Sequence, residues 1–190
     1  MAAHYETPPV GAKADFAADF AALVPSLSGE RVDLRAPQVG DFDVYAGIVC
    51  GARGVYVGGP MDRDEAWLDF VQMAAGWMLQ GHGGWTVTSK ETGAVLGFVL
   101  LGLEPGDHEV ELGFLFTEAA EGRGFAQEAA LAARDWAGLA LGLTSLVSYI
   151  DPANTRAITM MGHMGAKRDP QAEAELNDDA QVWRHEGDAA

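Results

Sequence analysis

One continuous stretch, residues 109–141, constrains the fold of this chain more than any other. Charged and apolar residues alternate over residues 109–112, which is the pattern of a half-buried strand. Gly113 interrupts the alternation and predicts either a β-bulge or a close backbone approach. A turn containing Gly122 and Gly124 follows, and residues 127–141 are an alanine-rich segment that predicts a helix. We therefore expect a strand, a glycine turn and a helix in direct succession.

The glycine turn has the chemistry of an anion-binding site. Gly122 and Gly124 have no side chain, so their backbone N–H groups can face a ligand at close range. The first turn of the helix adds N–H groups without intrahelical partners and the positive end of the helix dipole. Together these features predict a phosphate cradle. The dinucleotide fingerprint Gly-x-Gly-x-x-Gly is the competing phosphate motif, and it fails because position 127 is Gln127.

Two motifs in this order resemble the acyl-CoA-binding core of the GNAT superfamily of N-acetyltransferases. The loop motif of that family is Gln/Arg-x-x-Gly-x-Gly/Ala, and residues 119–124 match both glycines but have Ala119 in place of Gln or Arg. The second motif is Asp151-Pro-Ala-Asn154, followed by Met164-Gly165. The chain is most similar to the branch that acetylates the N-termini of ribosomal proteins and similar amines, over about residues 27–184.

The resemblance implies an α/β (α+β) fold. Its central sheet is mixed and mostly antiparallel, with about six to seven strands flanked by helices. The fourth and fifth strands splay apart. Residues 29–190 are expected to form the acyl-CoA-dependent N-acetyltransferase domain, preceded by an N-terminal arm and short helix over residues 1–28. This helix has Phe16, Phe20 and Leu23 at helical spacing, and it packs either on the domain or against a second subunit of a homodimer.

The resemblance also implies acetyl-CoA as the cosubstrate. An open strand edge binds the amides of its pantetheine arm, the glycine turn binds the pyrophosphate, and an Asn touches the arm. The expected acetyl-CoA-binding residues are the strand residues Phe114, Leu115 and Phe116, the turn residues Gly122, Arg123, Gly124, Phe125 and Ala126, and Asn154.

The implied reaction is direct transfer of an acetyl group to a primary amine in a ternary complex, without a metal. A protonated amine must first lose a proton, because α-amino groups titrate at about 7.7–8 and lysine at about 10.4. We expect Glu111 to accept this proton, with Glu109 as the alternative. Both residues are equally compatible with solvated carboxylates on the polar face of a strand. The glycine-rich residues 50–60 are expected to shape the amine pocket.

The proton donor for the leaving thiolate is unassigned. Met161 and Ala157 stand where related proteins often have Tyr or Ser, and neither side chain can donate a proton. Two other functions therefore stay open: a non-catalytic acyl-CoA-binding protein of this fold, and a structural partner protein that has lost the cofactor. The acceptor amine is either a small molecule or the N-terminus of a peptide.

Charge and cysteine content narrow the classes of partner. The net charge of −16, from 12 basic and 28 acidic residues, disfavours nucleic acids and anionic membrane surfaces. It suits a cationic substrate, although solubility alone also explains it. Cys50 is the one cysteine, so no intramolecular disulfide forms. Residues 1–9 do not have the pattern of a signal peptide, and we expect a cytoplasmic protein.

Overall fold

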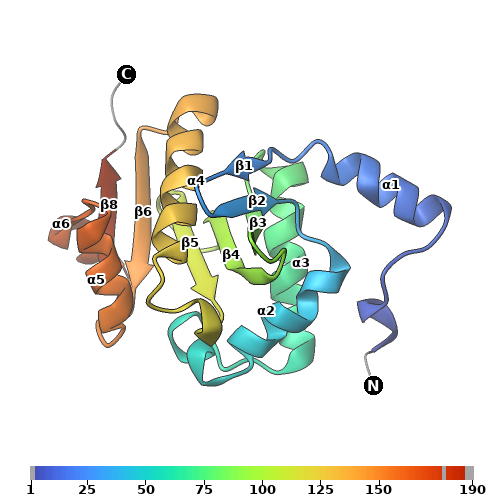
Figure 1. The fold of residues 1–190 in the computed structure, drawn as a ribbon. Coiled ribbons are helices and arrows are strands. Elements are labelled where there is room, and N and C mark those ends of the chain that lie inside the picture. Colours follow the sequence, from blue (N-terminus) through green and yellow to red (C-terminus); the bar gives the residue numbers. More distant parts are fainter. Residues whose placement is uncertain (1–2, 177–178, 187–190) are drawn as a thin grey trace.

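The computed structural model describes residues 3–176 and 179–186. In this part of the chain eight strands form one sheet, in the order β1-β2-β3-β4-β5-β6-β8-β7 (Figure 1). Neighbouring strands are antiparallel except β5 and β6, which are parallel. The predicted fold class is confirmed, and the strands that the sequence did not predict are the two-residue strands β1 and β7.

The described residues form strands, α-helices and short 3₁₀ helices with the following bounds. The strands are β1 (Leu27–Ser28), β2 (Val32–Arg35), β3 (Gly84–Ser89), β4 (Val95–Gly102), β5 (Glu111–Phe116), β6 (Ser145–Ile150), β7 (Lys167–Arg168) and β8 (Gln181–Glu186). The α-helices are α1 (Ala12–Ala21), α2 (Phe42–Val49), α3 (Arg63–Leu79), α4 (Phe125–Leu141), α5 (Thr155–His163) and α6 (Pro170–Glu173). Short 3₁₀ helices are η1 (His4–Glu6), η2 (Val39–Asp41), η3 (Ala52–Tyr56) and η4 (Glu118–Ala120).

Helices cover both faces of the sheet and enclose two apolar cores. α4 lies on one face, and α2 and α3 lie on the other (Figure 1). The period of two along β4 divides its side chains between the cores. Val99 and Leu101 pack on the α4 side, whereas Phe98 and Leu100 pack against α2 and α3. The sheet is thus buried on both faces, as its apolar strands require.

The alanine stripe on α4 allows this helix to lie close to the sheet. Ala129, Ala130, Ala133 and Ala137 are all 0% exposed, which confirms the predicted buried face. A helix that approaches this closely has its position set by the strands beneath it. Its N-terminus is therefore fixed beside the end of β5.

The strand pattern break at Gly113 is not a bulge. β4 and β5 pair without interruption from Gly102–Glu111 to Gly97–Phe116, so the predicted bulge is wrong. A Cβ atom at Gly113 would lie 2.9 Å from Cγ of Leu100, so the space beside this glycine is filled by a side chain and not by the backbone of the alternative prediction.

β5 and β6 form a single residue pair in the parallel ladder, Glu111–Val147. There the N–H of Val147 donates to the carbonyl of Val110 at 3.2 Å. One step further the hydroxyl of Ser148, and not a backbone N–H, donates to the carbonyl of Leu112 at 2.6 Å. Beyond this point no further β5–β6 couple is formed in the described sheet, which leaves the edge of β5 open to a ligand.

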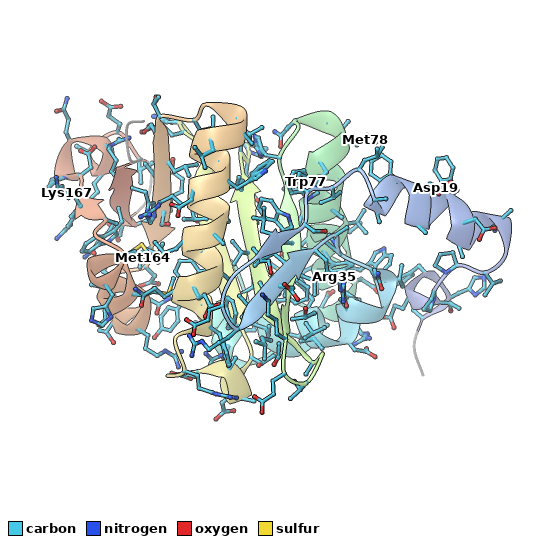
Figure 2. The ribbon with its side chains drawn as sticks, turned by 45° about the horizontal axis from the view of Figure 1, so that its top comes forward. Asp19, Arg35, Trp77, Met78, Met164 and Lys167 are labelled. Atoms are coloured by element: carbon cyan, nitrogen blue, oxygen red, sulfur yellow. The ribbon has the colours of Figure 1, made fainter. Side chains whose placement is uncertain are left out.

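The N-terminal segment has one docked and one protruding part. η1 is attached to the start of α3, because Glu6 forms an ion pair with Arg63 at 2.6 Å and the ring of Tyr5 lies 5.0 Å from that of Trp67. α1 has no buried residue and extends away from the sheet (Figure 1). Figure 2 shows the same helix with Asp19 labelled. The expectation of a loose arm is therefore wrong for η1, and the boundary at residue 28 stays a prediction.

Candidate active site

A cavity of about 540 Å³ lies along the open edge of β5 and the N-terminal end of α4. Most of the predicted acetyl-CoA-binding residues line it. These lining residues are Phe114, Leu115, Phe116, Gly122, Gly124, Ala126 and Asn154. We call this cavity the cofactor cleft, because it joins the predicted strand edge and the predicted phosphate cradle in one continuous space.

The glycine turn has the backbone conformation that only glycine adopts readily. Gly122 and Gly124 have φ angles of 69° and 78°, in the left-handed region. Gly124 is the N-cap of α4 and has no side-chain cap, and the N–H of Glu128 makes the first helical bond to its carbonyl. The preceding N–H groups of α4 are therefore presented to the cleft, as a phosphate requires.

Arg31 holds the turn from outside it, and Arg123 belongs to the turn itself. Arg31 donates from Nη1 to the carbonyl of Arg123 at 2.8 Å and forms an ion pair with Glu128 at 2.9 Å. The guanidinium groups of Arg31 and Arg123 both lie over the ring of Phe125, at 4.9 and 4.6 Å. Phe125 itself is 5% exposed and belongs to the core, so its predicted contribution to the cradle is limited to its backbone.

A second basic pair closes the far side of the cleft. Glu121 forms ion pairs with Arg53 at 2.7 Å and with Arg156 at 2.5 Å, and hydrogen bonds from both arginines lower the pKa of Glu121. Arg53 also donates from Nε to the carbonyl of Phe116 at 3.1 Å. Sequence reasoning missed Arg31 and Arg53, because they come from segments distant in sequence and match no local motif.

Alternate residues of β5 direct their backbone N–H and C=O groups to opposite sides of the strand, so only some of the predicted residues can bond a ligand through their backbone. The carbonyls of Val110 and Leu112 point toward β6, whereas the N–H of Thr117 donates toward β4, to Leu96, at 2.9 Å. Backbone groups of alternate residues face opposite neighbours, so Phe114 turns toward the open edge and Leu115 toward β4. Phe114 is thus the residue best placed to bond the pantetheine arm, and Leu115 contributes its side chain.

Asn154 is the N-cap of α5, and its side-chain Oδ1 accepts from the N–H of Ala157 at 3.2 Å. The cap occupies the acceptor oxygen and leaves the amide nitrogen of Asn154 as a donor. Asn154 borders the cofactor cleft and also a second cavity. This position agrees with the predicted contact to the pantetheine arm.

The second cavity, of about 850 Å³, adjoins the cofactor cleft and is called here the acceptor cavity. It extends between α3, the end of β4 and the start of β5. Residues common to both cavities mark the junction between them. They are Tyr56, Val57, Phe114, Leu115, Asn154 and Ala157.

Glu111 lines the acceptor cavity at the one point where β5 and β6 pair. Burial raises its pKa to about 8, and Asp107 and Glu104 add to this effect. A hydrogen bond from the backbone of Tyr149 opposes it. A carboxylate with a pKa this close to neutrality is well suited to accept and release a proton.

Glu109 has a different environment. Its carboxylate forms an ion pair with Arg184 at 2.7 Å and accepts from the hydroxyl of Ser145 at 2.6 Å. These hydrogen bonds hold its pKa below the usual range, and Glu109 lines neither cavity. The structure therefore favours Glu111 over Glu109 as the proton acceptor.

The hydroxyl groups near the junction differ in their availability. The hydroxyl of Ser148 is buried and donates to Leu112, and that of Thr159 donates to the carbonyl of Thr155 at 2.8 Å. Among the described residues that line both cavities, Tyr56 is the one with a hydroxyl, and no sequence motif indicated this position. Met161 is 0% exposed and serves as a core residue.

Cys50 lies outside both cavities. Its Sγ atom is 3.6 Å from the carbonyl of Asp62, and burial raises its pKa. The described residues contain no group of three or more His, Cys, Asp and Glu side chains in a metal-binding arrangement. In the same part of the chain, no helix has the length and hydropathy needed to cross a membrane.

Comparison with known proteins places this geometry in a family. Residues 31–167 match the family model described as acetyltransferase (GNAT) domain. The crystal structure of an acetyltransferase from Agrobacterium tumefaciens str. C58 is 37% identical, with a TM-score of 0.81 over 85% of this chain and 94% of that chain.

More distant solved structures share the fold. RimL, a ribosomal L7/L12 alpha-N-protein acetyltransferase, is 12% identical with a TM-score of 0.67, over 85% of this chain and 92% of that chain. RimJ from Mycobacterium smegmatis, in complex with CoA-disulfide, is 16% identical with a TM-score of 0.65, over 84% of this chain and 85% of that chain. At these identities the likeness shows the fold.

Proposed function

The chain belongs to the GNAT family of acetyltransferases, and on that premise we propose that it transfers an acetyl group from acetyl-CoA to a primary amine by direct attack in a ternary complex. The observation that carries this proposal is the junction of the two cavities at the open edge of β5, with Glu111 on the acceptor side. One cavity has the groups that bind a phosphorylated acyl carrier, and the other has a carboxylate suited to deprotonate an amine.

The cofactor cleft holds acetyl-CoA through two sets of groups in this proposal. Backbone N–H groups at Gly122, Gly124 and the first turn of α4 bind the pyrophosphate. The open edge at Phe114 and the amide of Asn154 bond the pantetheine arm, as a strand edge binds an added peptide. The thioester then lies at the junction, facing the acceptor cavity.

Glu111 prepares the nucleophile. The ammonium group of the acceptor donates its proton to the Glu111 carboxylate, directly or through water, and the neutral nitrogen attacks the thioester carbonyl carbon. The attack forms the C–N bond, and the nitrogen then carries one proton more than the amide product, which it releases to water. The C–S bond breaks as this intermediate collapses, and the sulfur leaves as a thiolate that must take up a proton. Holding both reactants at the junction supplies the proximity that a bimolecular reaction lacks.

Tyr56 is the proposed donor of that last proton. It borders both cavities, and phenol is a competent hydrogen-bond donor to a developing thiolate. The sequence left this function unassigned because Tyr56 lies on η3, in the glycine-rich segment, and not on the helix after Asn154. This assignment makes the residues 50–60 part of the catalytic machinery as well as of the amine pocket.

The direct experiment is an acetyl-transfer assay across amine classes with thiol release as the readout, combined with acetyl-CoA binding by calorimetry. We expect saturable binding and amine-dependent thiol release. Binding without release on any amine would support a non-catalytic acyl-CoA-binding protein instead. Absence of binding would support a partner protein that has lost the cofactor.

A further inference from the structure

The acceptor cavity is lined by four carboxylates: Asp69, Glu104, Asp107 and Glu111. Its described lining residues include no Lys, Arg or His. Carboxylates on an open surface are usually only solvated. These carboxylates line a cavity that adjoins the cofactor cleft, so an acceptor that approaches the thioester through this cavity passes beside them.

Neutral groups, and not cations, hold three of these carboxylates. Asp69 accepts from the hydroxyl of the buried Tyr45 at 2.5 Å, and Glu104 accepts from the side-chain amide of Gln72 at 3.1 Å. Glu111 accepts from the backbone of Tyr149. These bonds orient the carboxylates and leave their charge uncompensated.

Elsewhere in the described chain, carboxylates with a shifted pKa are ion-paired with arginine, and their pKa is lowered. They are Glu6, Glu109, Glu121, Glu128, Asp169 and Glu173. In the acceptor cavity burial raises the pKa of Asp69, Glu104 and Glu111, and the negative charge of Asp69 adds to the effect at Glu104. In the described chain, arginines pair with carboxylates outside the acceptor cavity, and none lines the cavity itself. The cavity therefore lacks the positive charge that would balance its carboxylates.

We infer that the acceptor is a small-molecule amine with a second cationic group, and that Asp69 and Glu104 bind this second group while the reacting amine lies at Glu111. This inference rests on the proposed function and names its substrate class. The cavity volume of about 850 Å³ is that of a small-molecule site. A dication supplies the positive charge that Asp69 and Glu104 lack, and a neutral or anionic amine leaves these two carboxylates unpaired.

The test compares putrescine, a four-carbon diamine, with the analogue in which a hydroxyl replaces one amino group. We expect kcat/KM for putrescine to exceed that of the analogue by at least roughly tenfold, beyond the factor of two for its two equivalent amines. Calorimetry with the CoA-loaded protein should show the same order of affinity without depending on turnover. Equal affinity and equal kcat/KM for the two compounds would overturn the inference while leaving acetyl transfer itself intact.

Variants assign the preference to the cavity. Asp69→Asn and Glu104→Gln keep the hydrogen bonds from Tyr45 and Gln72 while removing charge, so each should reduce the preference for putrescine. Glu91→Gln, at an exposed turn between β3 and β4, removes the same charge elsewhere and should leave the preference intact. A preference that survives both cavity substitutions, or faster transfer to a neutral peptide N-terminus than to putrescine, would contradict the assignment. Binding of putrescine without any transfer would support the inference and count against the proposed reaction.

Discussion

Two glutamates of the same sequence pattern have opposite chemistry in the folded protein. Glu111 lies against the acceptor cavity, where burial raises its pKa to about 8. Glu109, two residues earlier, is neutralised by Arg184, and its pKa is lowered. The difference arises from what each carboxylate faces, a desolvated cavity or a guanidinium group.

Glu111→Gln should lower kcat about a hundredfold at neutral pH, the usual cost of losing a general base. Affinity for acetyl-CoA should change little, because Glu111 lies on the acceptor side of the junction. The wild-type rate should rise with pH through about 8 as Glu111 loses its proton, and the deficit of the variant should shrink at higher pH as the amine deprotonates unaided. Steady-state kinetics from pH 6 to pH 10 measure both effects, with Glu109→Gln as the control. A larger loss in Glu109→Gln than in Glu111→Gln would reverse the assignment.

The same pKa shift predicts a pH-dependent stability. Glu111 binds its proton more tightly in the folded state, so its stabilising contribution is complete below about pH 4.5 and is lost as the pH rises through about 8. The free energy of unfolding of Glu111→Gln relative to wild type should therefore be higher at pH 9 than at pH 5. The expected increase is up to roughly 5 kcal/mol, at 1.36 kcal/mol for each unit by which the pKa is raised. Urea unfolding of wild type and variant at both pH values measures this difference. A difference that does not vary with pH would show that Glu111 is not protonated by burial.

Tyr56→Phe removes the proposed proton donor and keeps the ring. We expect kcat to fall by roughly tenfold to a hundredfold, toward the lower end of general acid catalysis, because solvent can also protonate a thiolate. Acetyl-CoA affinity should stay within about twofold of wild type, since only a hydroxyl at the junction is removed. Stopped-flow measurement of thiol release separates the chemical step from product release. An unchanged single-turnover rate would exclude Tyr56 as the donor.

Helix α4 links the apolar core to the cofactor cleft. Its four buried alanines bring it close to the sheet, and its first turn lies at the cofactor cleft. Both ends of the helix are glycines with positive φ, Gly124 at 78° and Gly142 at 65°. This symmetry provides a matched pair of positions on one helix.

Gly124→Glu and Gly142→Glu place the same side chain at the same strained conformation, so both should lose a similar amount of stability, about 1–2 kcal/mol. Only the first brings a carboxylate to the phosphate cradle, where repulsion should weaken acetyl-CoA binding at least a hundredfold. Calorimetry on both folded variants measures this contrast. Similar affinities for acetyl-CoA in the two variants would mean that the pyrophosphate binds elsewhere.

The sheet and its two cores form one unit, and α1 extends away from that unit. Phe16 and Leu23, on α1 and just after it, are 74% and 78% exposed, and α1 buries no residue of its own. The predicted packing of this segment on its own domain is therefore not observed, and packing against a second subunit stays a prediction. The segment that follows is tied to the sheet, because the indole of Trp85 donates to the carbonyl of Pro25 at 2.7 Å.

Removal of residues 1–21 should leave the two cores intact. We expect a melting temperature only a few degrees lower, from loss of the Glu6–Arg63 contact, and unchanged acetyl-CoA affinity. Light scattering on the full-length and shortened chains tests for a homodimer held by α1. Aggregation or loss of cofactor binding in the shortened chain would place the N-terminal segment within the catalytic domain.

Local patterns predicted the strand, the glycine turn and the helix at the centre of the chain. Strand alternation, the glycine pair and the alanine-rich segment each depend on neighbours within a few residues. They were sufficient to predict β5, α4 and the turn between them, which borders the cofactor cleft.

The functions of the charged residues depend on contacts between segments far apart in the sequence. Arg31 bonds the carbonyl of Arg123, and Arg53 bonds the carbonyl of Phe116. Tyr56 and Asp69 line the acceptor cavity from η3 and α3, and no motif links these segments to β5. The pKa of a carboxylate depends on its burial and on the charges that face it, and a local sequence pattern predicts neither. That is why Glu109 and Glu111, two residues apart in one alternating pattern, have different environments in the folded protein.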